Sequence, residues 1–196
     1  MTQANADPIV TFQKWFQEAE SQESTLPEAA ALATITPDGF PRVRVVLIKS
    51  FSSSGFDFFT NYKSQKALDI EHLPRASLGF HWKSMERQIR IDGSIRQLES
   101  TLSDRYWSMR PRGSQIAAWA SDQSCPIETR EVLNERFEIM RNRFPEGPIP
   151  RPDFWGGYRL IPQQIEFWQG QMNRLHDRLV FTRTDSGHWN RQRVQP

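Results

Sequence analysis

With 196 residues and a mean hydropathy of −0.66, the chain fits one soluble domain with a substantial core, and no apolar run approaches the ~20 residues that cross a bilayer. No signal-peptide pattern opens the sequence, and its only cysteine, Cys125, cannot form an internal disulfide, so we expect a cytoplasmic protein without membrane association. The balance of 25 basic and 23 acidic residues, without a basic tail, argues against a nucleic-acid partner.

The first half of the chain predicts one helix followed by antiparallel strands. Asp7 and Pro8 are typical of a helix start, and apolar residues then recur at helical spacing at Ile9, Phe12, Trp15, Phe16 and Ala19. Residues 29–36 and 43–49 are predicted to form a hairpin around a turn at 37–39. Further strands are expected at 56–60, 76–82 and 88–98, with a helix over 64–72 that Ser64 caps.

The second half predicts three helices, a stiff connector and a final set of strands. The helices are expected at 101–109, 114–120 and 127–144. Four prolines make the connector: Pro145, Pro148, Pro150 and Pro152. The last strands are expected at 158–161, 164–169, 178–184 and 188–194. Short strands at hairpin spacing with a few helices indicate an antiparallel barrel or sandwich in an α+β domain over 7–196, after a flexible N-terminus at 1–6.

Several kinds of chemistry are disfavoured because their sequence signatures are missing. There is no glycine-rich dinucleotide or P-loop fingerprint and no G-x-S-x-G nucleophile elbow. The four histidines and Cys125 show no metal-ligand spacing, so we expect no metal site.

Two groups of residues suit a phosphate. Arg44 and Lys49 lie on a predicted strand near a helix that begins at Ser64 beside Lys63 and Lys66, and helix starts bind anions. The alternative is a capped surface helix with solvated lysines. In the second group, Tyr106 and Arg110 share a helix face and Ser114 can cap the next helix. An ordinary helix-turn-helix explains this second group equally well. The residues of both groups are Arg44, Lys49, Lys63, Ser64, Lys66, Tyr106, Arg110 and Ser114.

A third group combines an aromatic ring with cationic side chains. In a strand, Arg174, His176 and Arg178 would project from one face and would repel one another unless an anion or an electron-rich ring lay between them. Trp168 is close in sequence, and the possible polar partners are Gln88, Gln123 and Ser124. The alternatives are a core tryptophan and a structural imidazole.

The chain resembles the pyridoxamine 5'-phosphate oxidase family from about residue 7 to its end. The resemblance rests on motifs that occur in order: Arg-Val-Val-Leu-Ile-Lys at 44–49, Phe-Thr-Asn at 59–61, Glu-Arg-Gln at 86–88, Arg-Pro-Arg-Gly-Ser-Gln-Ile at 110–116, Phe-Trp-Gly-Gly at 154–157, Phe-Trp-Gln-Gly at 167–170 and Arg-Leu-His-Asp-Arg at 174–178. It implies an FMN-binding split β-barrel with flanking helices, and a homodimer with two flavin sites at the subunit interface. The implied reaction oxidises pyridoxamine or pyridoxine 5'-phosphate to pyridoxal 5'-phosphate with O2, releasing H2O2.

The resemblance also implies residue roles. Arg44, Ser64 and Lys66 would contact the FMN phosphate; Phe59, Thr60 and Gln88 would lie along the flavin; and Gln123, Ser124, Trp168 and Arg178 would reach it from the other subunit. The full cofactor set is Arg44, Val45, Val46, Leu47, Ile48, Lys49, Phe59, Thr60, Ser64, Gln65, Lys66, Gln88, Gln123, Ser124, Trp168 and Arg178. The substrate phosphate would meet Lys49, Tyr106, Arg110 and Ser114, and the catalytic residues facing its ring would be Arg174 and His176.

Two departures from the family pattern bear on function. Gln65 stands where the family usually has Arg, so looser FMN binding is expected. The chain also begins too close to its first helix for a full N-terminal arm, so water exclusion and turnover would be poorer. A different FMN split-barrel oxidoreductase, or a flavin- or pyridoxal phosphate-binding protein without this activity, remains the alternative.

Overall fold

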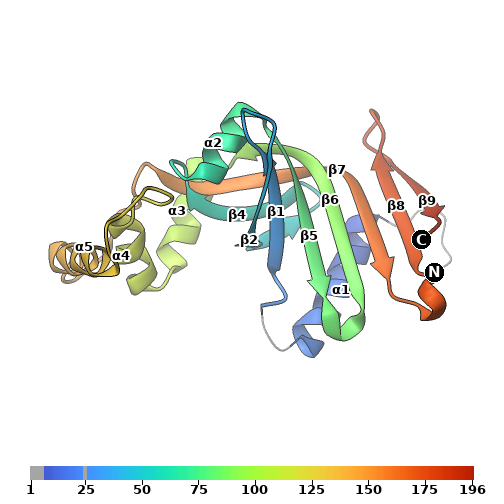
Figure 1. Ribbon diagram of the computed structural model, residues 1–196, viewed down its shortest axis with the longest axis horizontal. Helices are drawn as coiled ribbons and strands as arrows, with labels where there is room; N and C mark the ends of the chain where they lie inside the picture. The colour runs from blue at the N-terminus through green and yellow to red at the C-terminus, as the bar shows by residue number, and fades with distance from the viewer. Residues whose placement is uncertain (1–6, 24–25) are drawn as a thin grey trace.

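The structure, a computed structural model, describes residues 7–23 and 26–196, so the N-terminus expected at 1–6 lies outside the described residues. Within them, nine strands form one antiparallel sheet in the order β2-β1-β5-β6-β7-β4-β3, with β8 paired to β7 and β9 to β8. The sheet curls into half a barrel, with helices at its flanks (Figure 1). This is the split β-barrel that the family resemblance implies, and it confirms the antiparallel α+β domain that the strand pattern predicts.

The first half follows the predicted order closely. Its elements are α1 (Pro8–Gln22), β1 (Ala29–Ile35), β2 (Pro41–Leu47), β3 (Ser50–Ser52), β4 (Gly55–Asn61), α2 (Gln65–His72), β5 (Arg75–Trp82) and β6 (Arg87–Gln97). The Asp7 side chain accepts a hydrogen bond from the Ile9 N–H at 2.9 Å, which confirms the expected helix start. The short strand β3 was not expected; it pairs only with β4.

The main core lies between α1 and the curled sheet. Phe12 is fully buried, and its ring meets those of Phe51, Phe56 and Phe80 edge to face at centroid distances of 4.8, 4.9 and 5.2 Å. Edge-to-face contacts of this kind add to the free energy gained from burial alone. The apolar stripe of α1 therefore fixes the helix across the sheet and holds the barrel closed on that side.

The second half contains α3 (Ser100–Met109), α4 (Arg112–Ala120), α5 (Arg130–Arg143), β7 (Trp155–Gln169), β8 (Asp177–Arg183) and β9 (Trp189–Val194). The three helices gather at one end of the molecule, and β8 and β9 lie at the other end (Figure 1). None of the helices in the described residues is long and apolar enough to cross a membrane. No group of three metal-ligating side chains is found in the same residues.

Strand β7 connects the two ends of the molecule. It pairs with β4 over its first half, with β8 over its second half and with β6 along most of its length. The sequence predicted two strands here, at 158–161 and 164–169, because Pro162 cannot donate to a strand ladder. The structure instead has one strand with a bulge: Gly93 pairs with Pro162 and Asp92 with Gln164, which leaves Gln163 without a partner.

Two predicted helix boundaries are wrong. Helix α4 begins at Arg112 after Pro111, so Ser114 lies in the first turn and does not cap it. Helix α5 begins at Arg130, where the Thr129 hydroxyl accepts a hydrogen bond from the Val132 N–H. For α2 the predicted start is correct, although the side chain of Ser64 makes no capping hydrogen bond.

Candidate cofactor and substrate site

A cavity of about 500 Å³ opens between β2, β4 and the N-terminus of α2. Its volume lies within the ~300–1,000 Å³ range of typical small-molecule sites. Four of the side chains around it are cationic, and no acidic side chain lines it among the described residues. The lining comprises Arg44, Val45, Val46, Leu47, Lys49, Phe59, Thr60, Gln65, Lys66, Tyr106, Arg110, Gln123 and Ser124.

Lys66 marks one end of this cavity. Its ammonium donates hydrogen bonds to the hydroxyls of Thr60 at 3.0 Å and Ser64 at 3.2 Å, and the residue is 8% exposed. No carboxylate pairs with it in the described part of the chain. Burial, together with repulsion from Arg44, lowers the pKa of Lys66 to about 8. An ammonium held in this way gains more from a bound anion than a solvated lysine does.

Arg44 stands beside Lys66, fixed by the neighbouring strand. Its guanidinium donates to the Thr34 hydroxyl at 2.6 Å and to the Leu32 carbonyl at 3.2 Å, and lies 3.5 Å from a carboxylate oxygen of Asp69. Burial lowers the pKa of Arg44, and Asp69 opposes that shift. Strand β1 therefore holds Arg44 in place at the cavity wall.

Arg110 marks the other end of the cavity. Its guanidinium lies 4.6 Å from the ring centroid of Trp155 and donates to the Ser114 carbonyl at 3.1 Å. Its Nε is buried with no hydrogen-bond partner, and burial lowers its pKa. Unpaired buried donors are rare and costly. Because this Nε is enclosed, a ligand in the cavity would meet the other nitrogens of the Arg110 guanidinium.

Tyr106 and Lys49 complete this end. The Tyr106 ring stacks on Phe59 with centroids 4.0 Å apart. Lys49 pairs with Glu28 at 3.2 Å, which leaves two of its protons for other acceptors. Ser114 lines a neighbouring cavity of about 260 Å³, and Arg110 lines both cavities. The structure thus brings the predicted substrate-phosphate residues to one end of the cavity, with Ser114 behind Arg110.

Gln123 and Ser124 belong to the same cavity in their own chain. The Gln123 side-chain oxygen accepts from the Thr60 hydroxyl at 3.3 Å and from the Asn61 N–H at 3.4 Å. The Ser124 hydroxyl accepts from the Gln65 N–H at the start of α2, at 3.3 Å. Within one chain they line the first cavity and not the cavity of Trp168 and Arg178, because the α4–α5 loop folds back onto β4.

Two predicted cofactor residues lie behind the cavity wall. Ile48 is 4% exposed and belongs to the main core. Ser64 is fully buried and contacts Lys66 from behind, so it acts on the cavity through that ammonium.

A second, smaller cavity of about 190 Å³ lies at the far end of β7. Gln88, Trp168 and Arg178 face one another across neighbouring strands, since Trp168 pairs with both of the others. The ring of His176 lies 4.5 Å from that of Trp168, and its Nδ1 accepts from the Gln171 N–H at 3.1 Å. The lining is Gln88, Arg90, Glu166, Trp168, His176, Arg178 and Pro196.

A buried carboxylate organises this second cavity. Glu166 is 5% exposed and accepts from Arg178 Nε at 2.7 Å and from Arg90 at 2.5 Å. Burial raises the pKa of Glu166, but the two guanidiniums outweigh it and the pKa falls below its ordinary value. Glu166 therefore stays ionised and fixes the direction of Arg178.

The predicted alternation of Arg174, His176 and Arg178 is wrong for Arg174. Strand β8 begins only at Asp177, and Arg174 ends a short 3-10 helix with φ of +60°, after Asn173 at +58°. Its side chain is exposed and lines neither cavity. Of these three residues, His176 and Arg178 line the second cavity together.

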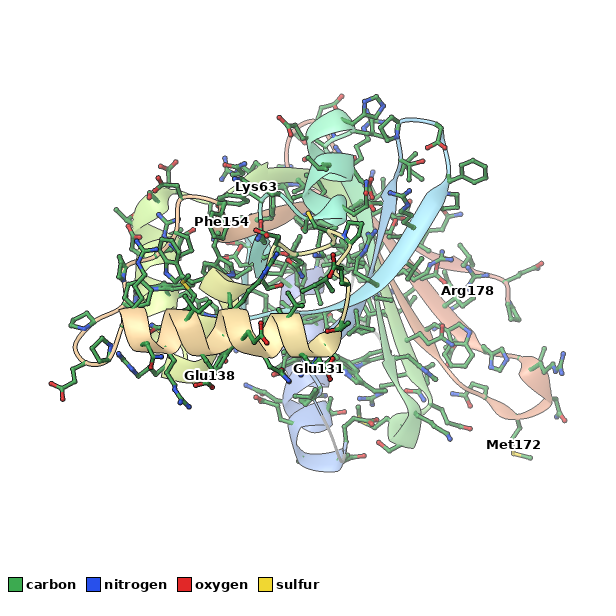
Figure 2. The ribbon with its side chains drawn as sticks, turned by 60° about the vertical axis from the view of Figure 1, so that its left-hand side comes forward. Lys63, Glu131, Glu138, Phe154, Met172 and Arg178 are labelled. Carbon is green, nitrogen blue, oxygen red and sulfur yellow. The ribbon has the colours of Figure 1, made fainter. Side chains whose placement is uncertain are left out.

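The two cavities are separate in one chain, and no residue lines both. Val45 of the first cavity pairs with Ala31, Ala31 with Gly79, and Gly79 with Arg90 of the second, so the two linings lie three strands apart across the sheet, roughly 15 Å at ~4.8 Å per strand. Figure 2 shows Arg178 of the second cavity on the right, apart from Lys63 and Phe154, which lie left of centre. Within one chain the two linings therefore do not form one continuous cavity.

The comparisons with known proteins fit this architecture. Residues 16–143 match the family model described as "Pyridoxamine 5'-phosphate oxidase", and residues 155–196 match "Pyridoxine 5'-phosphate oxidase C-terminal dimerisation region". The pyridoxine/pyridoxamine 5'-phosphate oxidase of Rubrobacter xylanophilus is 50% identical over 193 residues, which cover 98% of this chain and 88% of the relative. Pyridoxine/pyridoxamine 5'-phosphate oxidase 2 of Hydrogenovibrio crunogenus is 49% identical, over 97% of this chain and 89% of the relative.

Two solved structures share the fold. PhzG from Burkholderia lata 383, in complex with tetrahydrophenazine-1-carboxylic acid, has a TM-score of 0.91 at 31% identity, over 99% of this chain and 94% of PhzG. A pyridoxamine 5'-phosphate oxidase-related, FMN-binding protein from Nostoc punctiforme has a TM-score of 0.79 at 18% identity. The match covers 97% of this chain and 98% of that protein.

The curled antiparallel sheet and these likenesses define a split β-barrel, the fold shared with the FMN-binding protein from Nostoc punctiforme. Within that class, the chain belongs to the pyridoxamine 5'-phosphate oxidase family. The match of residues 155–196 to a dimerisation region supports a homodimer. This segment includes β8 and five of the seven residues that line the second cavity.

The sequence did not single out Arg42, Asp69 or Glu166. Asp69 and Glu166 are buried carboxylates that bind arginines of the two cavities, and Arg42 shares Asp69 with Arg44. The spacing of Gln65 and Asp69, four residues apart on one helix face, was a usable signal for Asp69.

Proposed function

We propose that this protein is an FMN-dependent oxidase that converts pyridoxamine or pyridoxine 5'-phosphate to pyridoxal 5'-phosphate, with O2 as electron acceptor and H2O2 as product. The observation that carries the proposal is the first cavity. It is lined by two sets of cationic side chains, Arg44 with Lys66 and Lys49 with Arg110, and by no carboxylate among the described residues. Two anionic groups fit that pattern.

The Arg44 end suits the phosphate of FMN. Arg44 and Lys66 would neutralise it, and Gln65 and the start of α2 would donate hydrogen bonds. Gln65 is neutral, which supports weaker binding than a guanidinium at this position would give. The ring system would lie along β2 and β4, against Phe59, Thr60 and the backbone of 45–47.

The Arg110 end suits the phosphate of the substrate. Arg110 supports this assignment, because it lines the cavity and no carboxylate pairs with it among the described residues. Tyr106 and Lys49 would donate to the same group. Ser114 would support it from the neighbouring cavity through Arg110.

We propose that the second cavity completes the site from the other subunit of a homodimer. Gln88, Trp168 and Arg178 would contact the flavin across the interface, and Arg174 and His176 would face the substrate ring. The match of residues 155–196 to a dimerisation region supports this arrangement, since five of the seven residues that line the second cavity lie in that segment. The exposed position of Arg174 is consistent with a contact made only by the second subunit or the substrate.

The protein's part in the reaction is binding and orientation. Bound FMN would supply the redox chemistry, accepting a hydride equivalent from the substrate and passing electrons to O2. Arg110, Lys49 and Tyr106 would fix the substrate by its phosphate, and His176 and Arg174 would orient its ring. His176 accepts a backbone hydrogen bond at Nδ1, so in its neutral form the proton lies on Nε2, which can donate to the substrate.

A different oxidase of the same fold is the second candidate, because PhzG was solved with tetrahydrophenazine-1-carboxylic acid. That ligand is named as a carboxylic acid and not as a phosphate ester. Cations at both ends of the first cavity favour a phosphorylated substrate over such a ligand.

Steady-state oxygen consumption by the FMN-loaded protein tests the proposal. Pyridoxamine and pyridoxine 5'-phosphate should support O2 uptake with H2O2 formation, and unphosphorylated pyridoxamine should support little. Arg110→Ala should raise KM mainly. Turnover of a phosphate-free aromatic acid instead of both phosphorylated compounds would favour the second candidate.

A further inference from the structure

The buried carboxylate of Asp69 gathers side chains from three elements behind the Arg44 end of the cavity. It is fully buried on α2. Oδ2 accepts from the Thr34 hydroxyl at 2.8 Å and lies 3.5 Å from Arg44. Oδ1 accepts from the Gln65 side-chain amide at 3.2 Å and from Arg42 at 3.4 Å. Two arginines therefore share one carboxylate, each from its own side.

The two arginines have different surroundings. Arg42 and Arg44 are alternate residues of β2 and project from the same face. Arg44 lines the cavity, whereas Arg42 does not and its side chain is 44% exposed. Arg42 thus meets the charge of Asp69 from outside the cavity wall, and Arg44 meets it from the cavity side.

This arrangement affects the charge that the cavity offers. A buried carboxylate strongly attracts any nearby cation. If Arg42 were absent, Arg44 would be the remaining cation at Asp69 in the described structure, and its charge would be offset there. With Arg42 present, Asp69 is balanced from behind, and Arg44 and Lys66 keep their positive potential toward the cavity.

Gln65 shares Oδ1 of Asp69 with Arg42 but brings no charge. An amide satisfies a lone pair of the carboxylate without neutralising it. The positive charge at Oδ1 therefore comes from β2, through Arg42, and not from the helix start that lines the cavity.

We propose that Arg42 is a positioning residue for phosphate binding: by balancing Asp69 from outside the cavity, it keeps Arg44 available to the phosphate of the cofactor. This rests on the proposed function, since the phosphate is that of FMN. It gives a residue outside the cavity a measurable role in cofactor affinity.

The test is the affinity of the apoprotein for FMN, measured by flavin fluorescence. Arg42→Gln should weaken FMN binding roughly five-fold at low salt, the scale of a half-exposed ion pair. The loss should shrink at high ionic strength, because the effect is electrostatic. Riboflavin, which lacks the phosphate, should bind both proteins equally. Arg141→Gln on α5, an exposed arginine paired with Glu138, lowers net charge equally and should change nothing.

Relocating the charge separates this role from a merely structural one. Arg at position 65 would also contact the phosphate directly, so the comparison is made within a Gln65→Arg background. There the new guanidinium can reach the same Oδ1, and adding Arg42→Gln should cost less FMN affinity than it does in the wild-type protein. Wild-type affinity in Arg42→Gln, an equal loss for riboflavin, a loss that persists at high salt or an undiminished loss in the Gln65→Arg background would each overturn the inference. Failure of the wild-type apoprotein to bind FMN at all would overturn the proposed function as well.

Discussion

At the residue scale, the buried ammonium of Lys66 makes cofactor binding depend on pH. Its pKa in the free protein is lowered to about 8, so below that pH it is charged and ready for a phosphate. An anion beside it raises its pKa in the complex, so binding takes up a proton above pH 8. We therefore expect FMN affinity to be constant from about pH 7 to 8 and to fall above it, by about tenfold per pH unit at most.

Titrating apoprotein with FMN between pH 7 and 9 measures this dependence. The control is Lys66→Met, which should bind FMN more weakly but with a flat pH profile. An unchanged slope in the variant would assign the titration to another group.

Arg174 is expected to act on the substrate and not on the cofactor. Its backbone has φ of +60°, a conformation that Asn tolerates better than Ala, so Arg174→Asn is the cleaner change. We expect kcat/KM to fall on the order of 10²-fold, because an orienting and charge-stabilising group is lost. FMN affinity should stay at the wild-type value, since Arg174 lines neither cavity. A wild-type rate of flavin reduction in stopped flow would make Arg174 structural.

Residue types near a helix start or in a motif could be predicted from the sequence, but their partners could not. Arg44, Lys66 and Arg110 were identified as anion-binding candidates and do line one cavity. Asp69 was missed because a buried carboxylate with two arginines has no local signature; its partners are 25 and 27 residues away. Long-range pairing of this kind is set by sheet register and not by spacing.

At the element scale, the glycines of β7 let the strand pass close under the cavity. A Cβ added to Gly157 would lie 2.5 Å from a Leu98 methyl carbon and 2.8 Å from the Phe59 ring. Gly157→Ala should therefore displace Phe59 from its stack on Tyr106 and cost about 1–3 kcal/mol of unfolding free energy by overpacking. FMN affinity should fall too. Thermal and denaturant unfolding measure the first effect and flavin titration the second.

Gly113→Ala is the matched control for that change. Nothing lies within 4 Å of a Cβ added there, and Ala suits the first turn of α4. It should leave FMN affinity unchanged and keep or raise stability. If Gly157→Ala behaved in the same way, β7 would have room that the described contacts do not show.

The elements themselves were mostly predictable, and the misses share a physical cause. Hydrophobic alternation and turn residues located the strands before β7, except the three-residue β3. Pro162 suggested a break in β7, but pairing with β6 and a bulge carry the strand past it. Arg174 was assigned to a strand because alternation continues in the sequence, whereas the chain turns through two positive-φ residues before β8.

At the scale of the whole molecule, the account predicts that two chains build each site. Arg110→Ala and Arg174→Asn variants, each defective alone, should complement one another when mixed as refolded or co-expressed dimers. A mixed dimer would have one site with both residues native, so random pairing should restore about a quarter of wild-type activity. No recovery, with mixed dimers verified by two affinity tags, would place the complete site in one chain.

The central claim is that the cations of the first cavity orient a phosphorylated B6 compound for oxidation by FMN. Anaerobic mixing of the FMN-loaded dimer with pyridoxamine 5'-phosphate in a stopped-flow spectrophotometer tests it most directly. We predict that the oxidised flavin absorbance disappears and that an equimolar amount of pyridoxal 5'-phosphate forms, while unphosphorylated pyridoxamine reduces the flavin far more slowly. Bound FMN that stays oxidised with both pyridoxamine and pyridoxine 5'-phosphate would contradict the account.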